Sequence, residues 1–591
     1  MLEGRPWRIV ALGLVLLWVA VIGTVWRVVP REDLENALST WAPAMVAVGF
    51  VILLVALVLC RLELAKIARR AGSRPIIALG LVLAGAGILR LFVVPAAHRV
   101  FNDEHVYEEM GLSIAFRGDA RAAHAGIYEE GRLTLMGGRY EKWPSAFPVC
   151  LALAYRLFGA GEGVAFTTNV LLSVAGIAAV GLVGALFFRE GRSWLYAAIV
   201  YAILPQNNYW AHSASVEPSA AAFGALAIAA VALAAEFPSW RTYVLAASAL
   251  AASLQFRMES LFLLPVALAV VTLRRPGEFR SARFWGATLL LALLLSGHVL
   301  HTLSVSVEYD PAMGEGIGFE AAQFLPNLRT NARFFVDIER FPVPCTILAL
   351  VGLLASGEPR SRLVIALWFL LFWGVFLFYY LGSYYFHTEE RYSLVCLAPF
   401  ALLAGRGWEK IISGFGGRGT GFGRNHVHVF ADPNPEPRRP TPGRGFGKSC
   451  RSFCLFALLV ALYLPQMRTV DPKTAPFQAE HEFVARTFRD SPEDALFLST
   501  HPSIPIAHGR SGVASWLVLD KEEWSLYLVS RRSSRVFLYH GLTHGPDSPE
   551  ETMCRAILER YDHRVAGEMR VGRFDLVFYE LWRNRKGDES P

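Results

Sequence analysis

The chain has 591 residues, of which 54% are hydrophobic, and its mean hydropathy is +0.37. Soluble domains rarely reach this balance because they need a polar surface to face water. The net charge of +7 does not indicate nucleic acid as a partner, because the basic residues are confined to a few connections between apolar runs, as in membrane proteins.

The apolar residues form runs of the length needed for membrane-spanning helices, about 20 residues. The longer runs are residues 9–29, 41–60, 76–95, 163–188, 214–235, 284–303 and 363–381. The shorter runs, expected to cross once their flanks are included, are residues 144–158, 195–209, 243–256, 261–273, 343–355, 393–404 and 453–465. The sequence therefore predicts a polytopic α-helical membrane protein with roughly 12 to 14 transmembrane helices. The first run is too long for a cleaved signal peptide and is expected to remain as an anchor.

Charge predicts the orientation of these helices. Residues 406–451 carry nine Lys and Arg against three acids, whereas residues 305–340 carry three Arg against six acids. By the positive-inside rule the basic connections are cytoplasmic and the acidic ones external, which also places the loop 96–143 outside. One inconsistency remains, because three apolar runs separate Lys142 from Ser213 although both are expected outside. Either one run does not cross or the helices are divided differently.

Three regions are predicted along the chain. Residues 1–75 hold an N-terminal pair of helices, and residues 76–465 form the membrane catalytic domain, with a flexible cytoplasmic loop at 405–452. Residues 466–591 have the pattern of a small extracytoplasmic α/β domain. Its expected strands are 495–499, 536–539 and 575–580, and its expected helices are 479–489 and 549–561. Ser548 is the expected N-cap of the last helix, with Glu551 completing a capping box.

The first external loop carries the most informative residues. Asp103 and Glu104 open it next to Tyr107, and Glu141 and Lys142 close it. Carboxylates at a membrane interface suit a general base, because partial loss of water raises their pKa toward the working range. A lysine at the same surface suits a lipid phosphate. The alternative is a solvated loop whose acids only keep it outside.

Two further polar segments lie on the same predicted face. Glu217 opens an apolar run. An ionisable group is costly there, which indicates either a functional residue or an acid that the helix dipole stabilises. Arg391 suits a phosphate through its bidentate guanidinium, with His387 nearby as a donor. Two charges are expected to have structural roles: Arg257 pairs with Glu259, and Arg90 extends from its helix end toward the interface.

Together these segments resemble the GT-C glycosyltransferases. The acidic pair at 103–104, the Glu-Lys-x-Pro segment at 141–144 and the Arg-Tyr helix start at 391–392 are similar to motifs of that family. The closest resemblance is to the branch of the protein O-mannosyltransferases and the lipid A aminoarabinose transferases, and it covers most of residues 76–406. The first two helices are additions, and Trp143-Pro144 stands where the family has Pro-Pro.

The resemblance implies a reaction and a set of roles. A sugar passes with inversion from a polyprenyl phosphate in the outer leaflet to an acceptor. Asp103 would be the base, Glu104 its support, and Lys142 the group that neutralises the lipid phosphate, with help from Arg391. The residues expected around the sugar or acceptor pocket are Glu217, His387, Glu141 and Tyr107. Membrane lipids are the other expected partners, and the location is the plasma (inner) membrane.

The alternatives are a transporter or lipid flippase and, less favoured, a non-catalytic scaffold for the C-terminal domain. Transporters usually contain internal repeats and place charges near the bilayer midplane, whereas these residues lie at helix ends and in loops. No CxxC pair and no His/Cys cluster is visible in the sequence. We therefore expect catalysis without a cofactor or metal, although some members of the family use a divalent ion.

Overall fold

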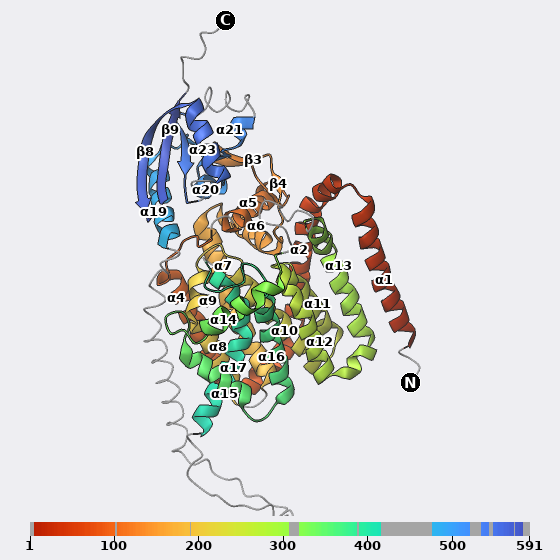
Figure 1. Ribbon diagram of the computed structural model, residues 1–591. Coiled ribbons are helices and arrows are strands. Elements are labelled where there is room, and N and C mark those ends of the chain that lie inside the picture. Colours follow the sequence, from red (N-terminus) through yellow and green to blue (C-terminus); the bar gives the residue numbers. More distant parts are fainter. Residues whose placement is uncertain are drawn as a thin grey trace, which may run out of the picture.

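The structure is a computed structural model, and it describes residues 5–100, 103–188, 191–305, 318–386, 389–414, 475–520, 533–542, 548–572 and 574–582. Helices dominate residues 5–414 (Figure 1). They are α1 (Arg5–Val28), α2 (Arg31–Leu59), α3 (Arg61–Ala71), α4 (Ser73–Phe92), α5 (Asp103–Phe116), α6 (Ala146–Phe158), α7 (Glu162–Phe187), α8 (Ser193–Ile203), α9 (Pro205–Ala211), α10 (Glu217–Glu236), α11 (Trp240–Leu254), α12 (Leu263–Arg274), α13 (Ala282–Val305), α14 (Phe324–Phe334), α15 (Val343–Leu354), α16 (Pro359–Val375) and α17 (Leu394–Gly414).

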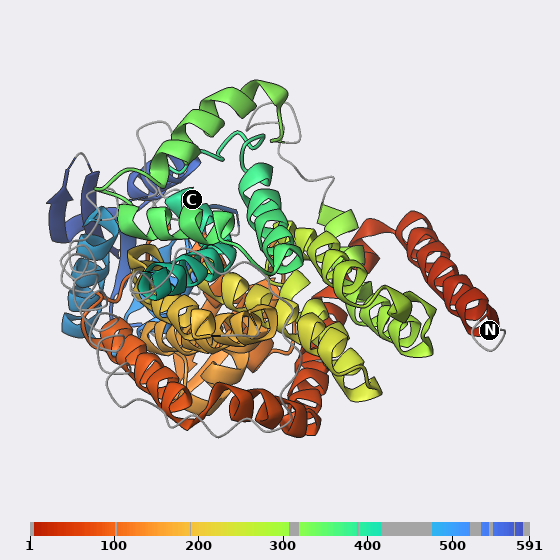
Figure 2. The same cartoon turned by 90° about the horizontal axis from the view of Figure 1, so that it is seen from below.

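The prediction of a polytopic helical membrane protein is confirmed. Among the described residues, six helices are long and apolar enough to cross a bilayer, namely α1, α2, α4, α7, α10 and α13. Three shorter apolar helices accompany them, α6, α8 and α15. Each predicted apolar run falls on helix, except 453–465, which lies outside the described residues together with most of the loop 405–452. Helix α1 lies at the edge of the bundle in both views, beside α13 (Figure 2).

The inconsistency between Lys142 and Ser213 is explained by α6. This helix has 13 residues and so is about 20 Å long, whereas the hydrocarbon layer is about 30 Å thick. It packs against α5 between the helix bundle and the sheet (Figure 1), so it lies at the end of the bundle. The run 195–209 is divided at Leu204 because Pro205 begins α9. Lys142 and Ser213 therefore lie at the same end of the bundle. Helix α7 leads away from that end, and α8 and α9 lead back to it.

Arginine side chains meet the C-terminal ends of helices α7 and α10. Helices α7 and α10 begin at Glu162 and Glu217, near α5. At their other ends, Arg274 donates to the carbonyl oxygen of Leu186 at 2.7 Å, and Arg275 donates to that of Ala235 at 3.0 Å. The arginines thus satisfy carbonyl groups that a helix C-terminus leaves without partners.

The C-terminal region forms an α/β domain above this bundle (Figure 1). Its sheet has the strand order β3-β2-β6-β5-β7-β9-β8. The strands are β2 (Ala125–Glu129), β3 (Arg132–Met136), β5 (Leu496–Ser499), β6 (Ser511–Ala514), β7 (Val536–His540), β8 (Asp562–Val571) and β9 (Phe574–Trp582). The hairpin β2–β3 comes from the first loop of the membrane part, and Ala125 of β2 pairs with Val513 of β6. The sheet therefore joins both parts of the chain.

Two helices cover opposite faces of the sheet. Helix α19 (Ala475–Asp490) packs Phe483 and Phe488 against Phe497 of β5, whereas α23 (Pro549–Arg560) packs Ile557 against Leu496 and other residues of the opposite face. Neighbouring residues of a strand point to opposite faces, so β5 contributes to both apolar layers.

The predicted elements of this domain are confirmed at β5, β7, β9, α19 and α23, whereas β6 and β8 were not predicted. Ser548 is the N-cap of α23, because its side chain accepts the N–H of Glu551 at 3.1 Å. The expected capping box is wrong. The Glu551 carboxylate instead accepts from His540 at 2.8 Å and Arg555 at 2.9 Å, which are stronger partners than a main-chain N–H.

Helices α15 and α17 approach each other through glycines. A Cβ atom added at Gly352 would overlap the carbonyl oxygen of Leu403, and one added at Gly407 would overlap that of Leu348. Small residues permit such close backbone contact between membrane helices.

We predict that Gly407→Ala lowers the free energy of unfolding by roughly 1–3 kcal/mol, because the methyl group forces the two backbones apart. The matched control is Gly374→Ala in α16, where a Cβ meets nothing within 4 Å. Thermal unfolding in detergent should show a lower midpoint for the first variant alone. Equal midpoints would contradict the close approach.

Candidate active site

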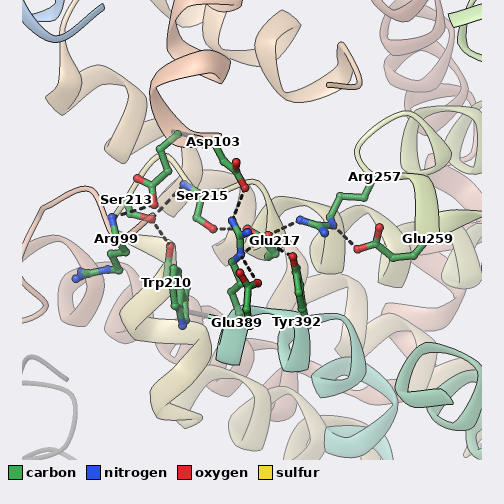
Figure 3. Close-up of polar contacts among 12 residues, drawn as sticks. Arg99, Asp103, Trp210, Ser213, Ser215, Glu217, Arg257, Glu259, Glu389 and Tyr392 are labelled. Atoms are coloured by element: carbon green, nitrogen blue, oxygen red, sulfur yellow. Dashed lines mark hydrogen bonds and ion pairs between the residues drawn. The ribbon is translucent and has the colours of Figure 1, made fainter. Parts of the chain in front are cut away.

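The centre of the candidate site is an ion pair between two distant segments. Asp103 is the first residue of α5, and Arg391 lies in the short helix η5 (Glu389–Ser393) that leads into α17. The Arg391 Nη1 donates to Asp103 Oδ2 at 2.8 Å. Figure 3 shows Asp103 reaching this cluster from one side while Glu389 and Tyr392 approach from the other.

Glu217 joins the same cluster from the start of α10. Its Oε1 lies 3.5 Å from Arg391 Nε and also accepts from Arg257 Nη1. The second oxygen, Oε2, accepts from the Ser215 hydroxyl. Arg257 also pairs with Glu259 through its Nε, as expected from the sequence. One buried carboxylate thus holds two guanidinium groups, which satisfies the requirement that buried charges be paired.

The cluster contains more acids than bases. Its carboxylates are Asp103, Glu217, Glu259 and Glu389, and its bases are Arg257 and Arg391. Burial raises the pKa of Glu389, which lies 3.3 Å from Arg391 Nε. The side chain of Asp103 is 19% exposed, against 7% for Arg391 and 1% for Glu217. Asp103 is therefore the carboxylate of this central group that a substrate reaches most readily.

Glu104 lies next to Asp103 but has a different environment. Its two carboxylate oxygens accept the main-chain N–H groups of Arg99 and Ala214, each at 3.0 Å. Burial raises the pKa of Glu104 to about 8, partly opposed by these hydrogen bonds and by the charge of Arg99. Glu104 thus connects the start of α5 to the segment before α10, and it positions Asp103 rather than facing Arg391.

Lys142 and Glu141 border the site. The Lys142 Nζ lies 5.2 Å from the centre of the Trp143 ring, and that ring lies 5.7 Å from the ring of buried Tyr107. Lys142 itself is exposed. Glu141 accepts from Arg139 Nε at 2.8 Å, and burial raises its pKa. The Lys142 ammonium group is therefore on the accessible rim of the site, and the Glu141 carboxylate is directed to Arg139.

The structure brings together Asp103, Glu217 and Arg391, with Tyr107 beside them. His387 lies outside the described residues. The sequence analysis missed Glu389 and Tyr392 as members of the cluster, although both neighbour Arg391, and it missed the link from Arg257 to Glu217. Only the packing of α10 against the segment before η1 (Met258–Phe262) reveals that link.

The expectation that Arg90 extends to the interface is wrong. This side chain is fully buried, and it donates to Asn208 Oδ1 at 2.9 Å and to Ser173 Oγ at 2.8 Å. Asn208 also donates to the carbonyl groups of Ala202 and Leu204 at the break between α8 and α9. Arg90 can stay inside because the interrupted helix supplies polar partners.

A second polar cluster lies between the bundle and the α/β domain. Two groups of side chains there place ligand atoms close enough to share a metal ion, and His98 belongs to both. One group adds His105 and Glu108 of α5, and the other adds Glu162 of α7 and His481 of α19. Burial lowers the pKa of His98 to about 4, so its ring is neutral near pH 7. The sequence analysis missed both groups: the first lies within residues 98–108, and the second joins residues that are far apart in the chain.

Comparison with known proteins shows a likeness of fold. No protein-family model matches the chain, and no curated protein matches it in sequence. The structure of ArnT from Cupriavidus metallidurans in the apo state is similar at 13% identity and a TM-score of 0.50, over 86% of this chain and 98% of that one. The same protein bound to undecaprenyl phosphate is similar at 15% identity and a TM-score of 0.49, over 85% and 97%. The arabinofuranosyltransferase AftD from Mycobacteria is similar at 14% identity and 0.48, over 86% and 40%. At these identities the apo ArnT comparison supports a shared fold, which confirms the GT-C-like architecture predicted above.

We predict that Glu217→Gln lowers the free energy of unfolding by roughly 3–5 kcal/mol, because it weakens the pairing of two buried guanidinium groups. The control is Arg70→Gln at an exposed ion pair, where Arg70 lies 3.2 Å from Glu236 and is 61% exposed; its removal should cost less than about 1 kcal/mol. Thermal unfolding of both variants in detergent tests the difference. Similar midpoints would mean that the Glu217 cluster does not hold the fold.

Proposed function

We propose that the chain is a membrane glycosyltransferase that passes a sugar from a polyprenyl phosphate to an acceptor hydroxyl. The observation that carries this proposal is the partly exposed Asp103 carboxylate at one end of the helix bundle, which is held by Arg391, itself paired with Glu217. The fold shared with ArnT and the resemblance of the motifs around these residues support it. The transporter alternative is weaker because the charged cluster lies at helix starts, whereas transporters bind near the midplane.

In the proposed reaction the Asp103 carboxylate takes the proton of the acceptor hydroxyl. The acceptor oxygen then forms a bond to the anomeric carbon of the sugar, and the bond from that carbon to the phosphate oxygen breaks. The displacement inverts the anomeric centre and releases the polyprenyl phosphate, while the proton leaves Asp103 for water. The phosphate is a good leaving group, so the site has to stabilise negative charge more than to donate a proton.

Lys142 is assigned as the main binding group for the donor phosphate. The Arg391 guanidinium already contacts Asp103, Glu217 and Glu389, so a phosphate would have to compete with three carboxylates for it. Lys142 lies on the accessible rim beside Trp143 and supplies a point charge to a phosphate oxygen. Arg391 is then mainly the group that orients Asp103, with an auxiliary contact to the phosphate.

The site and the α/β domain are assigned to the extracytoplasmic side of the plasma (inner) membrane. The basic connections that contain Arg274 and Arg275 lie at the end of the bundle opposite Asp103, and basic connections remain in the cytoplasm. A donor in the outer leaflet therefore meets Asp103 and Lys142 at the water–lipid boundary.

We predict that Asp103→Asn reduces sugar transfer by roughly 10²- to 10⁴-fold, the usual contribution of a general base. The fold should persist because Glu217 and Glu389 still pair with Arg391. The control is Asp119→Asn, which removes an ion pair with Arg117 in the same loop. Release of lipid phosphate from a panel of polyprenyl-phosphate sugars measures both. Full activity of the first variant would remove Asp103 as the base.

We also predict that Lys142→Ala raises the KM for the lipid donor by about 10-fold or more, with a smaller effect on kcat, because the ammonium group holds the phosphate in the ground state as well. Lys142→Arg should recover part of the affinity. Lys66→Ala, in the basic helix α3 at the other end, is the control. An unchanged donor KM in Lys142→Ala would contradict the phosphate role.

A further inference from the structure

Four side chains meet where the α/β domain rests on the helix bundle. His98 precedes α5 and Glu162 begins α7, whereas His481 lies on α19 and His508 follows α20 (Ser503–Ala507). Glu162 is the common partner. Its Oε2 lies 3.1 Å from His481 Nδ1 and 3.6 Å from His508 Nδ1, and its Oε1 lies 3.7 Å from His98 Nδ1.

We propose that His98, Glu162 and His481, completed by His508, bind a divalent transition-metal ion of the Zn²⁺ class that fastens the α/β domain to the helix bundle. This site is separate from the Asp103 cluster and does not depend on the proposed transferase activity. Its role is structural, because four protein ligands leave no open position for a reacting water.

The distances between the ligand atoms fit such an ion. Zinc binds His nitrogen and carboxylate oxygen at about 2.0–2.2 Å, so a tetrahedral site separates neighbouring ligand atoms by roughly 3.3 Å. The observed separations from the Glu162 oxygens are 3.1, 3.6 and 3.7 Å. The ligand atoms of His98, Glu162 and His481 all lie within 4.8 Å of one another.

The second ring nitrogen of His98 has the partner that a metal-bound histidine requires. Its Nε2 lies 2.8 Å from Glu108 Oε2, so a proton on Nε2 leaves the lone pair of Nδ1 directed at Glu162. A carboxylate in this position fixes the tautomer and strengthens the ligand. Glu108 is fully buried, and its other oxygen, Oε1, has no hydrogen-bond partner among the described residues.

Charge also favours a cation at this place. Glu108 and Glu162 are 0% and 6% exposed, and the groups nearest to them are imidazoles. A buried carboxylate is costly unless it is paired with a positive charge or binds a metal ion. One divalent ion would balance the charge of both carboxylates. Because three imidazoles are present and calcium and magnesium prefer oxygen ligands, zinc and similar metals fit better.

The site would also order the catalytic helix. Helix α5 presents Asp103 and Tyr107 to the Arg391 cluster, whereas Glu108, on another side of the helix, faces His98. An ion bound to His98 thus restrains α5 through Glu108, in addition to the sheet contact made by β2.

The test measures metal binding by the full-length chain without a histidine tag. The protein is stripped with a chelator, titrated with Zn²⁺ and freed of excess ion, and the retained metal is counted by mass spectrometry. We expect one ion per chain and a higher unfolding midpoint with zinc, since binding to the native state stabilises it. His481→Asn should abolish retention, and Glu108→Gln should weaken it roughly 10- to 100-fold.

The matched control is His563→Asn, which alters an exposed histidine of β8 in the same domain and should retain zinc like the wild type. The Glu108 variant keeps the four ligands, and its unfolding midpoint without zinc, compared with that of the wild type, separates weaker binding from loss of folding. Absence of retained zinc in the wild type, or equal retention in the His481 variant, would overturn the proposal. Neither outcome depends on sugar transfer, so failure here is distinct from failure of the proposed function.

Discussion

The buried guanidinium of Arg391 is the interaction on which the site depends. It contacts Asp103 from α5, Glu217 from α10 and Glu389 from its own short helix, so three parts of the chain meet at one charge. A guanidinium remains ionised in proteins, and in a poorly hydrated place it must be surrounded by acceptors. This requirement holds the start of α5 against the helix bundle and leaves the Asp103 carboxylate the most exposed acid of the cluster.

Helix α5 connects this cluster to the domain above it. On one side of the helix Asp103 contacts Arg391, and on another side Glu108 contacts His98, which lies between the bundle and the α/β domain. The loop that follows α5 adds the strand β2 to the C-terminal sheet. The α/β domain is therefore part of the support of the site rather than an appended unit, and movement of the domain would be transmitted to Asp103 through these contacts.

Several residue roles changed once partners were visible. Arg90 was expected to reach water, but the break at Leu204 gives it Asn208 inside the bundle. Glu104 was expected to support Asp103, and its partners are the main-chain N–H groups of Arg99 and Ala214. Such differences between adjacent acids depend on helix phase and on the segment opposite, and neither is visible in a local pattern. The strand β6 was missed for a similar reason, since one of its two partners is β2, which lies far away in the chain.

What the sequence determined by itself was the membrane class, most helix positions, the α/β character of the C-terminal region and the candidates Asp103, Glu217 and Arg391. These follow from local properties, because a bilayer demands long apolar runs and makes every charge within them costly. Only the tertiary structure decided that α6 lies at the end of the bundle, that Arg391 is the counter-ion of Asp103, and that histidines from both parts of the chain meet between the bundle and the α/β domain. Those outcomes depend on which distant side chains satisfy one another's charges and hydrogen bonds, and that pairing exists only in the folded chain.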